Sequence, residues 1–447
     1  MGTKRSTRRP IRTGRVALVG VMVAAASACQ PYIVMSTATE QAINRPVAGT
    51  DRVEAACDLP AAGDRFARAT PESVGIDPKI LDWALEATRN ALTASVQVYR
   101  HNCLVATAGP EGANPNQQFQ LFSMTKSVVA LGVGRAVTLG LVDVDDPIGN
   151  YLDGLDAAHG ALTLRQLMTQ SSGLRFGWAN DLAGSVENSL DQALTMPISH
   201  APGTDFEYAQ TTVNVVAAVV ASAAGVDFQE FMDRELLSPI GISRSRWQWW
   251  RDAVGNTQGY AWLTMTSGDV ARLASLVLHQ GAWEGRQLID PAYIAAMSAP
   301  SATNPGYGYL VQVNSGDWWI ESFGGRRYEG PRLTSAPADT VMFSGFLDQD
   351  VFIVPSLDLV ISRNGLPMES RWRWRLFNRL MPAFPEVSAV DPAAPMPRST
   401  DIHIDWEQIA DVETLLRRLS TNGGAVPVAD AVGSNVPRVL SDTGLTR

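Results

Sequence analysis

The feature that most constrains this chain is a long, mostly apolar run over residues 128–141, which follows a serine and a lysine. The run does not alternate between apolar and polar residues as a half-buried strand does, and it is long enough for a buried helix. Ser123 and Lys126 stand three positions apart just before it, so on a helix their side chains share one face. The sequence therefore predicts a buried helix that presents a serine and an amine together at its N-terminus.

This arrangement suits nucleophilic chemistry. The free N–H groups and the positive dipole end of a helix N-terminus favour negative charge, such as an oxyanion. Burial among apolar neighbours disfavours the charged form of Lys126, which suits it to accept a proton, and a serine beside an amine base is an activated nucleophile. Taken alone, the pair also fits a helix-capping serine followed by a solvated lysine. The other lysines, Lys4 and Lys79, lack a long apolar setting.

Composition narrows the class of protein. The chain has 447 residues, of which 45% are hydrophobic and 18% charged, as in a globular protein with a sizeable core. This length suits two or three average domains, or one large domain with extensions. The formal net charge is −9, and no basic stripe lies outside the N-terminus. These values argue against a nucleic-acid partner.

The N-terminal 28 residues have the pattern of a secretory signal. Basic residues at positions 4–15 precede an apolar run over residues 16–26, which is too short to span a bilayer. The small residues before Cys29 resemble a bacterial lipobox, in which the cysteine is lipidated. We therefore expect export and a lipid anchor on Cys29, at the periplasmic or outer face of a bacterial membrane. Ordinary cleavage near this point is the alternative.

The rest of the chain is predicted to form a tether over residues 29–65, one domain over residues 66–385, and a C-terminal extension over residues 386–447. The extension is rich in Pro, Ala and Ser and has one predicted helix at 406–419. In an oxidising compartment Cys57 and Cys103 can pair and join the N-terminal arm to the first predicted hairpin; two buried free thiols are the alternative. The order of helix, hairpin, many helices, strands and helix indicates an α+β fold.

Several separated segments, in order, resemble the serine β-lactamase and penicillin-binding-protein superfamily, and within it the class C-like group of esterases, D-amino-peptidases and amide hydrolases. The resemblance covers roughly residues 69–382. It implies an antiparallel sheet flanked by helices, with a largely helical insertion domain. The segments that carry it are residues 122–127, 145–148, 164–174, 202–208, 263–269 and 344–363.

The resemblance also implies catalytic roles. Ser123 would be the acylated nucleophile and Lys126 would take or relay its proton. Tyr208 would act with Lys126 as general base and return the proton to the leaving group. The backbone amides of Ser123 and Phe346 would form the oxyanion hole, with Gly345 allowing close approach.

Two motifs depart from the family pattern. The second motif usually reads Tyr-x-Asn, and here Gln210 stands in the amide position. The third motif usually begins with lysine or histidine, and here Ser344 stands there, before Gly345. The missing cation would bind a substrate carboxylate, so a neutral ester or amide is expected. The segment at 348–360 most resembles the branch with 6-aminohexanoate-oligomer hydrolases and related esterases.

Further residues are candidates for the substrate pocket. Gln210, Ser344 and Gly345 are expected substrate contacts. An aromatic wall is expected from Trp247, Trp249, Trp250 and Trp262; for these tryptophans and for the rim residues named below, plain packing is the alternative. The histidines lack metal-ligand spacing, so neither a metal nor a cofactor is expected. The region at 175–200 is predicted to form the pocket rim, with Phe176, Trp178 and Asp181 as its contacts.

The sequence thus predicts an exported serine hydrolase that cleaves a small ester or amide through an acyl-enzyme on Ser123. One alternative is a non-catalytic, lipid-tethered cell-envelope protein of the same fold. A second is a peptidoglycan D,D-peptidase or β-lactamase, against which the serine at position 344 argues. Substrate identity, the preference for ester or amide, and oligomeric state stay open.

Overall fold

A computed structural model describes residues 56–89, 93–109, 115–176, 187–322, 325–366, 368 and 371–384. The predicted signal segment, Cys29 and the predicted helix at 406–419 lie outside these described residues. The helices are α2 (Pro78–Leu85), α3 (Met124–Thr138), α4 (Ala157–Gly160), α5 (Leu164–Met168), α7 (Ser189–Leu194), α8 (Thr212–Ala224), α9 (Phe228–Met232), α10 (Ser267–Leu278), α11 (Pro291–Met297) and α12 (Trp372–Leu380).

All the described strands longer than four residues belong to the main sheet. The strands are β1 (Thr93–Arg100), β2 (Cys103–Ala108), β3 (Gln118–Gln120), β4 (Gln248–Trp249), β5 (Leu263–Thr266), β6 (Ala282–Trp283), β7 (Arg286–Gln287), β8 (Gln312–Val313), β9 (Trp318–Ile320), β10 (Arg327–Glu329), β11 (Val341–Gly345), β12 (Gln349–Val354) and β13 (Leu359–Gly365).

The main sheet has six strands in the order β2-β1-β13-β12-β11-β8, and every neighbouring pair is antiparallel. Strands from the two ends of the domain meet in its centre, where Val98 of β1 lies opposite Ile361 of β13. The helices from α3 to α11 come between these two groups of strands. The structure therefore confirms the predicted α+β class, with an antiparallel sheet and a largely helical insertion.

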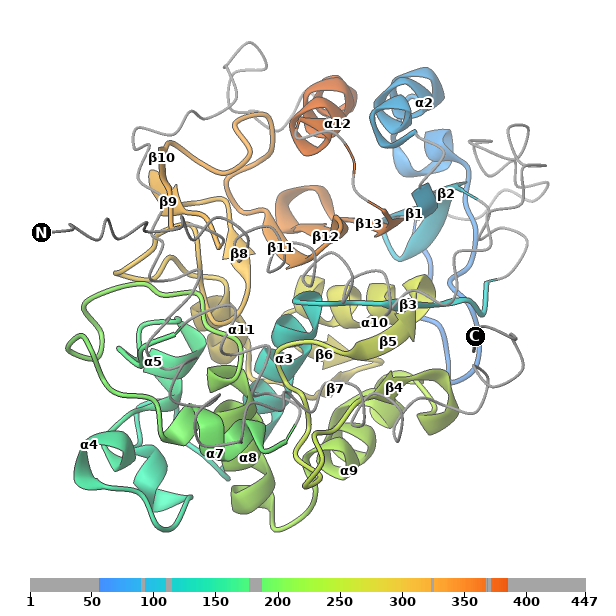
Figure 1. Cartoon of the computed structure of the whole chain (residues 1–447). Helices are drawn as coiled ribbons and strands as arrows, with labels where there is room; N and C mark the ends of the chain where they lie inside the picture. The colour runs from blue at the N-terminus through green and yellow to red at the C-terminus, as the bar shows by residue number, and fades with distance from the viewer. Residues whose placement is uncertain are drawn as a thin grey trace, which may run out of the picture. The chain divides into compact units, whose positions relative to one another are not determined.

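Helices cover both faces of this sheet (Figure 1), with α2 and α12 on one face and α3 and α10 on the other. Alternate residues of β12 serve the two cores, since Val351 and Ile353 pack on the α3 side and Phe352 and Val354 on the α12 side. All of β12 is consequently buried. This explains why residues 351–354 of β12 form an unbroken apolar run although the sheet is antiparallel.

Helix α3 runs through the middle of one core, and its residues 124–134 are all buried. A helix that is buried all round needs no polar face, which accounts for its mostly apolar sequence. Two glycines let its neighbours approach closely. A Cβ at Gly132 would overlap the sulfur of Met232, and one at Gly134 would overlap the ring of Tyr293.

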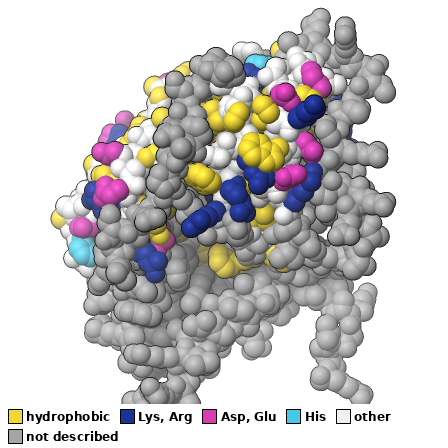
Figure 2. All heavy atoms as spheres, turned by 90° about the horizontal axis from the view of Figure 1, so that it is seen from above, with side chains coloured by type: hydrophobic (Ala, Val, Ile, Leu, Met, Phe, Trp, Pro, Cys, Tyr) yellow, Lys and Arg dark blue, Asp and Glu magenta, His cyan; other side chains and the backbone are white. Residues whose placement is uncertain are grey.

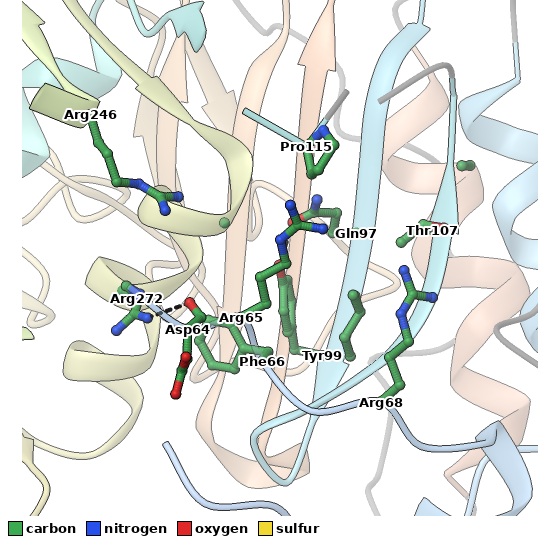
Figure 3. Close-up of a pocket in the computed structure, with 13 residues that line it drawn as sticks. Asp64, Arg65, Phe66, Arg68, Gln97, Tyr99, Thr107, Pro115, Arg246 and Arg272 are labelled. Atoms are coloured by element: carbon green, nitrogen blue, oxygen red, sulfur yellow. Dashed lines mark hydrogen bonds between the residues drawn. The ribbon is translucent and has the colours of Figure 1, made fainter. Parts of the chain in front are cut away.

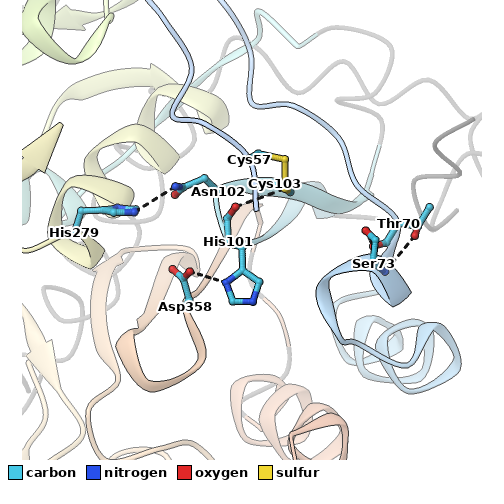
Figure 4. The surroundings of a disulfide bond; sticks show 8 residues. All are labelled: Cys57, Thr70, Ser73, His101, Asn102, Cys103, His279 and Asp358. Atoms are coloured by element: carbon cyan, nitrogen blue, oxygen red, sulfur yellow. Dashed lines mark hydrogen bonds and ion pairs between the residues drawn. A yellow bond between two sulfur atoms is a disulfide. The ribbon is translucent and has the colours of Figure 1, made fainter. Parts of the chain in front are cut away.

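A disulfide joins Cys57 to Cys103 at the start of β2, with their Cα atoms 5.2 Å apart (Figure 4). The backbone N–H of Cys57 also donates to the carbonyl of His101, at 2.9 Å. The predicted tether over residues 29–65 is therefore wrong for its last residues, because covalent and hydrogen bonds fix them to the domain. The buried guanidinium of Arg272 donates to three of their carbonyls, those of Pro60, Ala61 and Asp64.

The face that carries α2 and α12 mixes basic, acidic and apolar side chains (Figure 2). Ion pairs lie within this surface, as between Arg89 and Asp82 at 2.9 Å and between Arg379 and Glu86 at 3.5 Å. Such exposed pairs contribute little to stability, about 0–1 kcal/mol each.

Among the described residues no single helix has the length and apolar character needed to cross a membrane; Thr212–Ala224 and Phe228–Ile240 meet that test only as a pair, bent by 76°.

Candidate active site

Ser123 lies at the junction between a short strand and the buried helix. Strand β3 pairs with β5, and the chain continues to Leu121, whose N–H donates to the carbonyl of Leu263 at 2.9 Å. Phe122 then takes a left-handed backbone conformation, with φ of +50°. This conformation is costly for a bulky residue and is typical of functional sites. The turn places Ser123 at the N-cap of α3, as the sequence predicted.

Lys126 lies one helical turn further on and is only 1% exposed. Its Nζ donates to Ser123 Oγ at 3.2 Å, to Gln210 Oε1 at 2.6 Å and to the carbonyl of Tyr260 at 3.0 Å. An ammonium has three N–H donors, so each of them has an acceptor here. These contacts compensate the cost of burying the charge and hold the amine against the serine.

Tyr208 completes the group of side chains around Ser123. Its ring centroid lies 4.8 Å from Lys126 Nζ, and its hydroxyl is hydrogen-bonded to Ser123. Burial raises the pKa of Tyr208 to about 12, opposed by the hydrogen bond with Ser123 and by the positive charge of Arg332. At neutral pH Tyr208 on its own is thus a neutral phenol. The predicted trio of serine, lysine and tyrosine is together in space.

A turn after α5 fixes the backbone that carries Tyr208. Gln170 has a left-handed conformation, with φ of +57°, and its side-chain Oε1 accepts from the N–H of Ala209 at 2.5 Å. Its backbone carbonyl accepts from the N–H of Glu207 at 2.8 Å. Gln170 therefore accepts hydrogen bonds from the backbone on both sides of Tyr208. These bonds give a structural role to the segment at 164–174.

The end of β11 closes the site from the other side. A Cβ at Gly345 would overlap the carbonyl oxygen of Leu121, so only glycine allows this approach. The next residue, Phe346, places its ring edge-to-face against Phe122, with centroids 5.7 Å apart. The backbone of Phe346 thus lies beside the segment that leads into Ser123, as an oxyanion hole built from the amides of these two residues requires.

Ser344 occupies the position of the family's third-motif cation. Its hydroxyl donates to Asp350 Oδ1 at 2.7 Å, directly across the pair of strands β11 and β12. Asp350 is buried and also pairs with Arg373 at 2.7 Å; burial raises the pKa of its carboxyl. The Ser344 hydroxyl therefore uses its proton in the hydrogen bond to Asp350. Only its oxygen lone pairs remain to accept a hydrogen bond from a substrate.

Of the three predicted rim residues, only Phe176 lies within the described part of the chain. Phe176, expected to contact substrate at the rim, is instead 1% exposed, and its N–H donates to Glu207 Oε1 at 3.1 Å. A loop aromatic can pack inward as readily as outward, and the side chain of Phe176 is turned inward. Trp178 and Asp181 lie outside the described residues.

Only part of the expected aromatic wall is near Lys126. Trp247 and Trp249 are buried in the core. Trp250 and Trp262 are half-buried and stack on each other with centroids 5.3 Å apart. The Nε1–H of Trp262 donates to the hydroxyl of Tyr260 at 3.2 Å. Through Tyr260, which accepts from Lys126, this stacked pair adjoins the site.

Three contacts at the site were not predicted. The carbonyl of Tyr260 carries no side-chain signal, although Tyr260 lies just before the recognised segment at 263–269. Tyr307 packs edge-to-face on Tyr208 with centroids 6.2 Å apart. Arg332 stacks 4.3 Å from the ring of Trp319 and, because of burial, its pKa falls to about 9. No sequence pattern marks Arg332 or Tyr307.

A pocket lies away from these residues, between β1, β2 and α10 (Figure 3), and none of its lining residues is a predicted site residue. Two of its cations are already engaged, since Arg272 donates to backbone carbonyls and Arg246 pairs with Asp269 at 3.0 Å. Within the described residues no cluster of His, Cys, Asp or Glu has the geometry to hold a metal ion.

A serine hydroxyl between a buried lysine and a buried tyrosine, at the start of a helix packed on an antiparallel sheet, is the arrangement of the β-lactamase and penicillin-binding-protein class. A model of the Beta-lactamase family matches residues 81–361, and the chain belongs to this family.

Similarity to individual relatives is partial. Esterase EstB of Burkholderia gladioli is 28% identical over 193 residues, which is 36% of this chain and 48% of that protein. Penicillin-binding protein 4* of Bacillus subtilis is 24% identical over 140 residues, 29% of this chain and 31% of that protein. The chain thus spans less than half the length of these relatives. A crystal structure of SurE with D-Leu, 20% identical, has a TM-score of 0.51 and covers 69% of this chain and 76% of its own, which supports the fold alone.

Proposed function

We propose that this chain is an exported serine hydrolase that cleaves a small ester or amide through an acyl-enzyme on Ser123. The observation that carries the proposal is the position of the Ser123 hydroxyl, 3.2 Å from Lys126 Nζ and hydrogen-bonded to Tyr208. Nucleophile, amine and phenol are the parts that acyl transfer needs. The similarity to an esterase, EstB, is consistent with this activity.

The protons balance if Tyr208 and Lys126 act as one pair. A phenolate beside an ammonium has the same net charge as a phenol beside an amine, so one internal proton transfer interconverts them. The first form has a base in contact with Ser123. As Ser123 Oγ attacks the carbonyl carbon and the Oγ–C bond forms, its proton moves to Tyr208. The carbonyl oxygen then takes the negative charge.

The next steps return the site to its starting state. The amides of Ser123 and Phe346 stabilise the oxyanion. When the C–O or C–N bond breaks, Tyr208 gives its proton to the departing alkoxide or amide nitrogen. Water then attacks the acyl-enzyme with the same assistance, the acid leaves, and Ser123 regains its proton.

A neutral substrate fits this site better than one with a carboxylate. Ser344 leaves the end of β11 without a cationic side chain, and its hydroxyl is turned to Asp350. The nearby cation Arg373 is paired with both Asp350 and Asp348, at 2.7 and 2.6 Å. This favours an esterase or amidase over a D,D-peptidase or β-lactamase.

Export and anchoring belong to the same proposal. The features of residues 1–28 and the small residues before Cys29 support a lipid-anchored protein on the periplasmic or outer face of a bacterial membrane. A disulfide between Cys57 and Cys103 suits an oxidising compartment. Expression of wild type and Cys29→Ser in a bacterial host with an alkyne fatty acid tests this; label on wild type alone is expected, and equal labelling contradicts a lipid on Cys29.

The decisive test of the activity compares wild type with Ser123→Ala on short-chain esters, D-amino amides, ω-amino-acid oligomers and cephalosporins. Turnover and labelling by a fluorophosphonate should vanish in Ser123→Ala. A matched control is Ser127→Ala on the same helix, whose hydroxyl donates to the carbonyl of Leu310 at 2.8 Å. Unchanged hydrolysis in Ser123→Ala sinks the assignment. A folded wild type that no probe acylates favours the non-catalytic cell-envelope protein.

A further inference from the structure

Phe346 exposes a large apolar side chain at the place where the chemistry is proposed to occur. Its side chain is 59% exposed, whereas most large hydrophobic residues of the described chain are buried. Its ring meets that of Phe122 at 83°, with centroids 5.7 Å apart. Phe122 directly precedes Ser123. Two aromatic rings in contact at nearly a right angle thus lie at the segment that leads into Ser123.

The turn after Phe346 holds it firmly. Leu347 and Asp348 both have left-handed backbones, with φ of +64° and +59°, a conformation that persists only when its surroundings enforce it. The Asp348 carboxylate accepts from Arg373 at 2.6 Å, and its backbone carbonyl accepts from Arg363 at 2.7 Å. These charged contacts fix the turn, so Phe346 is presented on a rigid support.

The neighbouring side chains leave the surface at this point apolar. The proton of Ser344, two residues before Phe346, is committed to Asp350, and Gly345 has no side chain. Apart from the lone pairs of Ser344, what the side chains at the end of β11 offer to a substrate is the ring of Phe346. An exposed apolar group beside a reactive serine is costly to leave in water and gains free energy when an apolar ligand covers it.

We propose that Phe346 and Phe122 form an aromatic clamp that binds the apolar acyl chain of an ester substrate. This inference rests on the proposed function and names the substrate class within it. Phe346 supplies one of the two proposed oxyanion amides. Phe122 directly precedes Ser123, which supplies the other. A carbonyl held by those amides places its attached chain near the two rings.

The acyl side is favoured over the leaving-group side for a chemical reason. The leaving group takes its proton from Tyr208, so it departs on the side of Tyr208, whose ring packs against Lys126 and Tyr307. The acyl group stays bonded to Ser123 Oγ after the leaving group has gone. An apolar clamp beside Ser123 thus contacts the part of the substrate that remains through both steps.

The test uses p-nitrophenyl acetate, butyrate and octanoate, which differ only in the acyl chain. The readout is the ratio of kcat/KM for octanoate to that for acetate in wild type, Phe346→Ala and Phe346→Leu. Wild type should favour octanoate, and Phe346→Ala should lower the ratio roughly tenfold, mainly through KM. Phe346→Leu should restore part of it. A matched control is Leu139→Ala, since Leu139 is 40% exposed but caps the far end of α3.

The outcomes separate the two proposals. An unchanged ratio in Phe346→Ala, with wild type active and Ser123→Ala inactive, overturns the clamp and leaves the serine hydrolase standing. The same holds if Leu139→Ala lowers the ratio as much as Phe346→Ala does. A folded wild type that cleaves none of the esters but hydrolyses an amide or reacts with a fluorophosphonate overturns the clamp alone. A wild type that is folded by circular dichroism and reacts with none of these probes overturns both. A selective fall in Phe346→Ala, partly reversed in Phe346→Leu, supports the clamp.

Discussion

Gln210 Oε1 accepts from Lys126 Nζ at 2.6 Å, a shorter contact than the 3.2 Å between Lys126 Nζ and Ser123 Oγ. The family's usual asparagine is one methylene shorter than this glutamine. The longer side chain therefore serves as a support for the catalytic amine.

Removal of this support should reduce turnover without unfolding the protein. In Gln210→Ala the amine loses one of its acceptors and part of its orientation, so kcat should fall by about 10–100-fold. Gln210→Asn should retain more activity than Gln210→Ala. Steady-state kinetics on the best ester, with thermal melting as the control for folding, measures this. Equal kcat in wild type and Gln210→Ala would falsify the supporting role.

The positive charge of Arg332 should affect the pH dependence of kcat/KM. Its positive charge lowers the pKa of Tyr208, against the larger effect of burial. The active form of the Tyr208–Lys126 pair carries one proton fewer than a phenol beside an ammonium. Loss of that proton activates the site, so kcat/KM should rise with pH. Removing the charge in Arg332→Met raises the pKa of Tyr208, and the rise should move to higher pH.

Two controls separate charge from packing in that experiment. Arg332 Nε also donates to the carbonyl of Gly306 at 2.9 Å, so its loss disturbs a loop as well. Arg332→Lys keeps the charge and should leave the rise of kcat/KM near its wild-type pH, even if the rate drops. Arg327→Met removes an exposed arginine that pairs with Glu329 at 2.9 Å and should not shift the profile. Identical profiles for wild type and Arg332→Met would contradict the electrostatic role.

Gly345→Ala should damage activity more than stability. The added Cβ would overlap the carbonyl of Leu121, which pushes the end of β11 away from Ser123. A displacement of this kind costs about 100-fold in kcat/KM, because the oxyanion amides no longer fit the transition state. Gly268→Ala is the control, since its Cβ would meet only Thr266 Oγ1 at 3.9 Å. Full activity in Gly345→Ala would mean that this approach is not needed.

The disulfide should stabilise the fold. Cys57→Ser with Cys103→Ser should lower the free energy of unfolding by about 2–4 kcal/mol, measured by urea denaturation. Kinetic constants should stay close to wild type, because Cys57 and Cys103 pack in one core cluster and the residues of α3 pack in the other. Reductant should bring the wild-type denaturation curve to that of the double variant. If reductant leaves wild type unchanged, the bond makes no contribution to stability.

The predictable parts of the site are those encoded by local side-chain patterns. The apolar run of α3 and the spacing of Ser123 and Lys126 predict a helix with both groups on one face, and the structure has that geometry. Tyr208 follows from the ordered family segments. The meeting of β1 and β13 follows from the arrangement of predicted strands at the two ends of the domain.

The unpredicted parts depend on backbone groups and on loop packing. No side-chain pattern in the sequence indicates that the Tyr260 carbonyl accepts from Lys126. The hydrogen bonds that Gln170 accepts from the backbone around Tyr208 are equally hidden from the sequence. Phe176 was placed on the rim because a loop aromatic reads the same whether it packs inward or outward. The end of the tether is not predictable from the sequence. Its residues are held through their backbone carbonyls, which accept hydrogen bonds from Arg272, a residue far away along the chain.

The bond between Cys57 and Cys103 also determines how far the catalytic domain can reach. If Cys29 carries a lipid as proposed, the disulfide limits the chain between the anchor and the domain to residues 29–57. A chain of that length spans at most about 100 Å. The bond would thus set the largest distance between the lipid anchor and the domain, and so how far from the membrane the enzyme can meet its substrate.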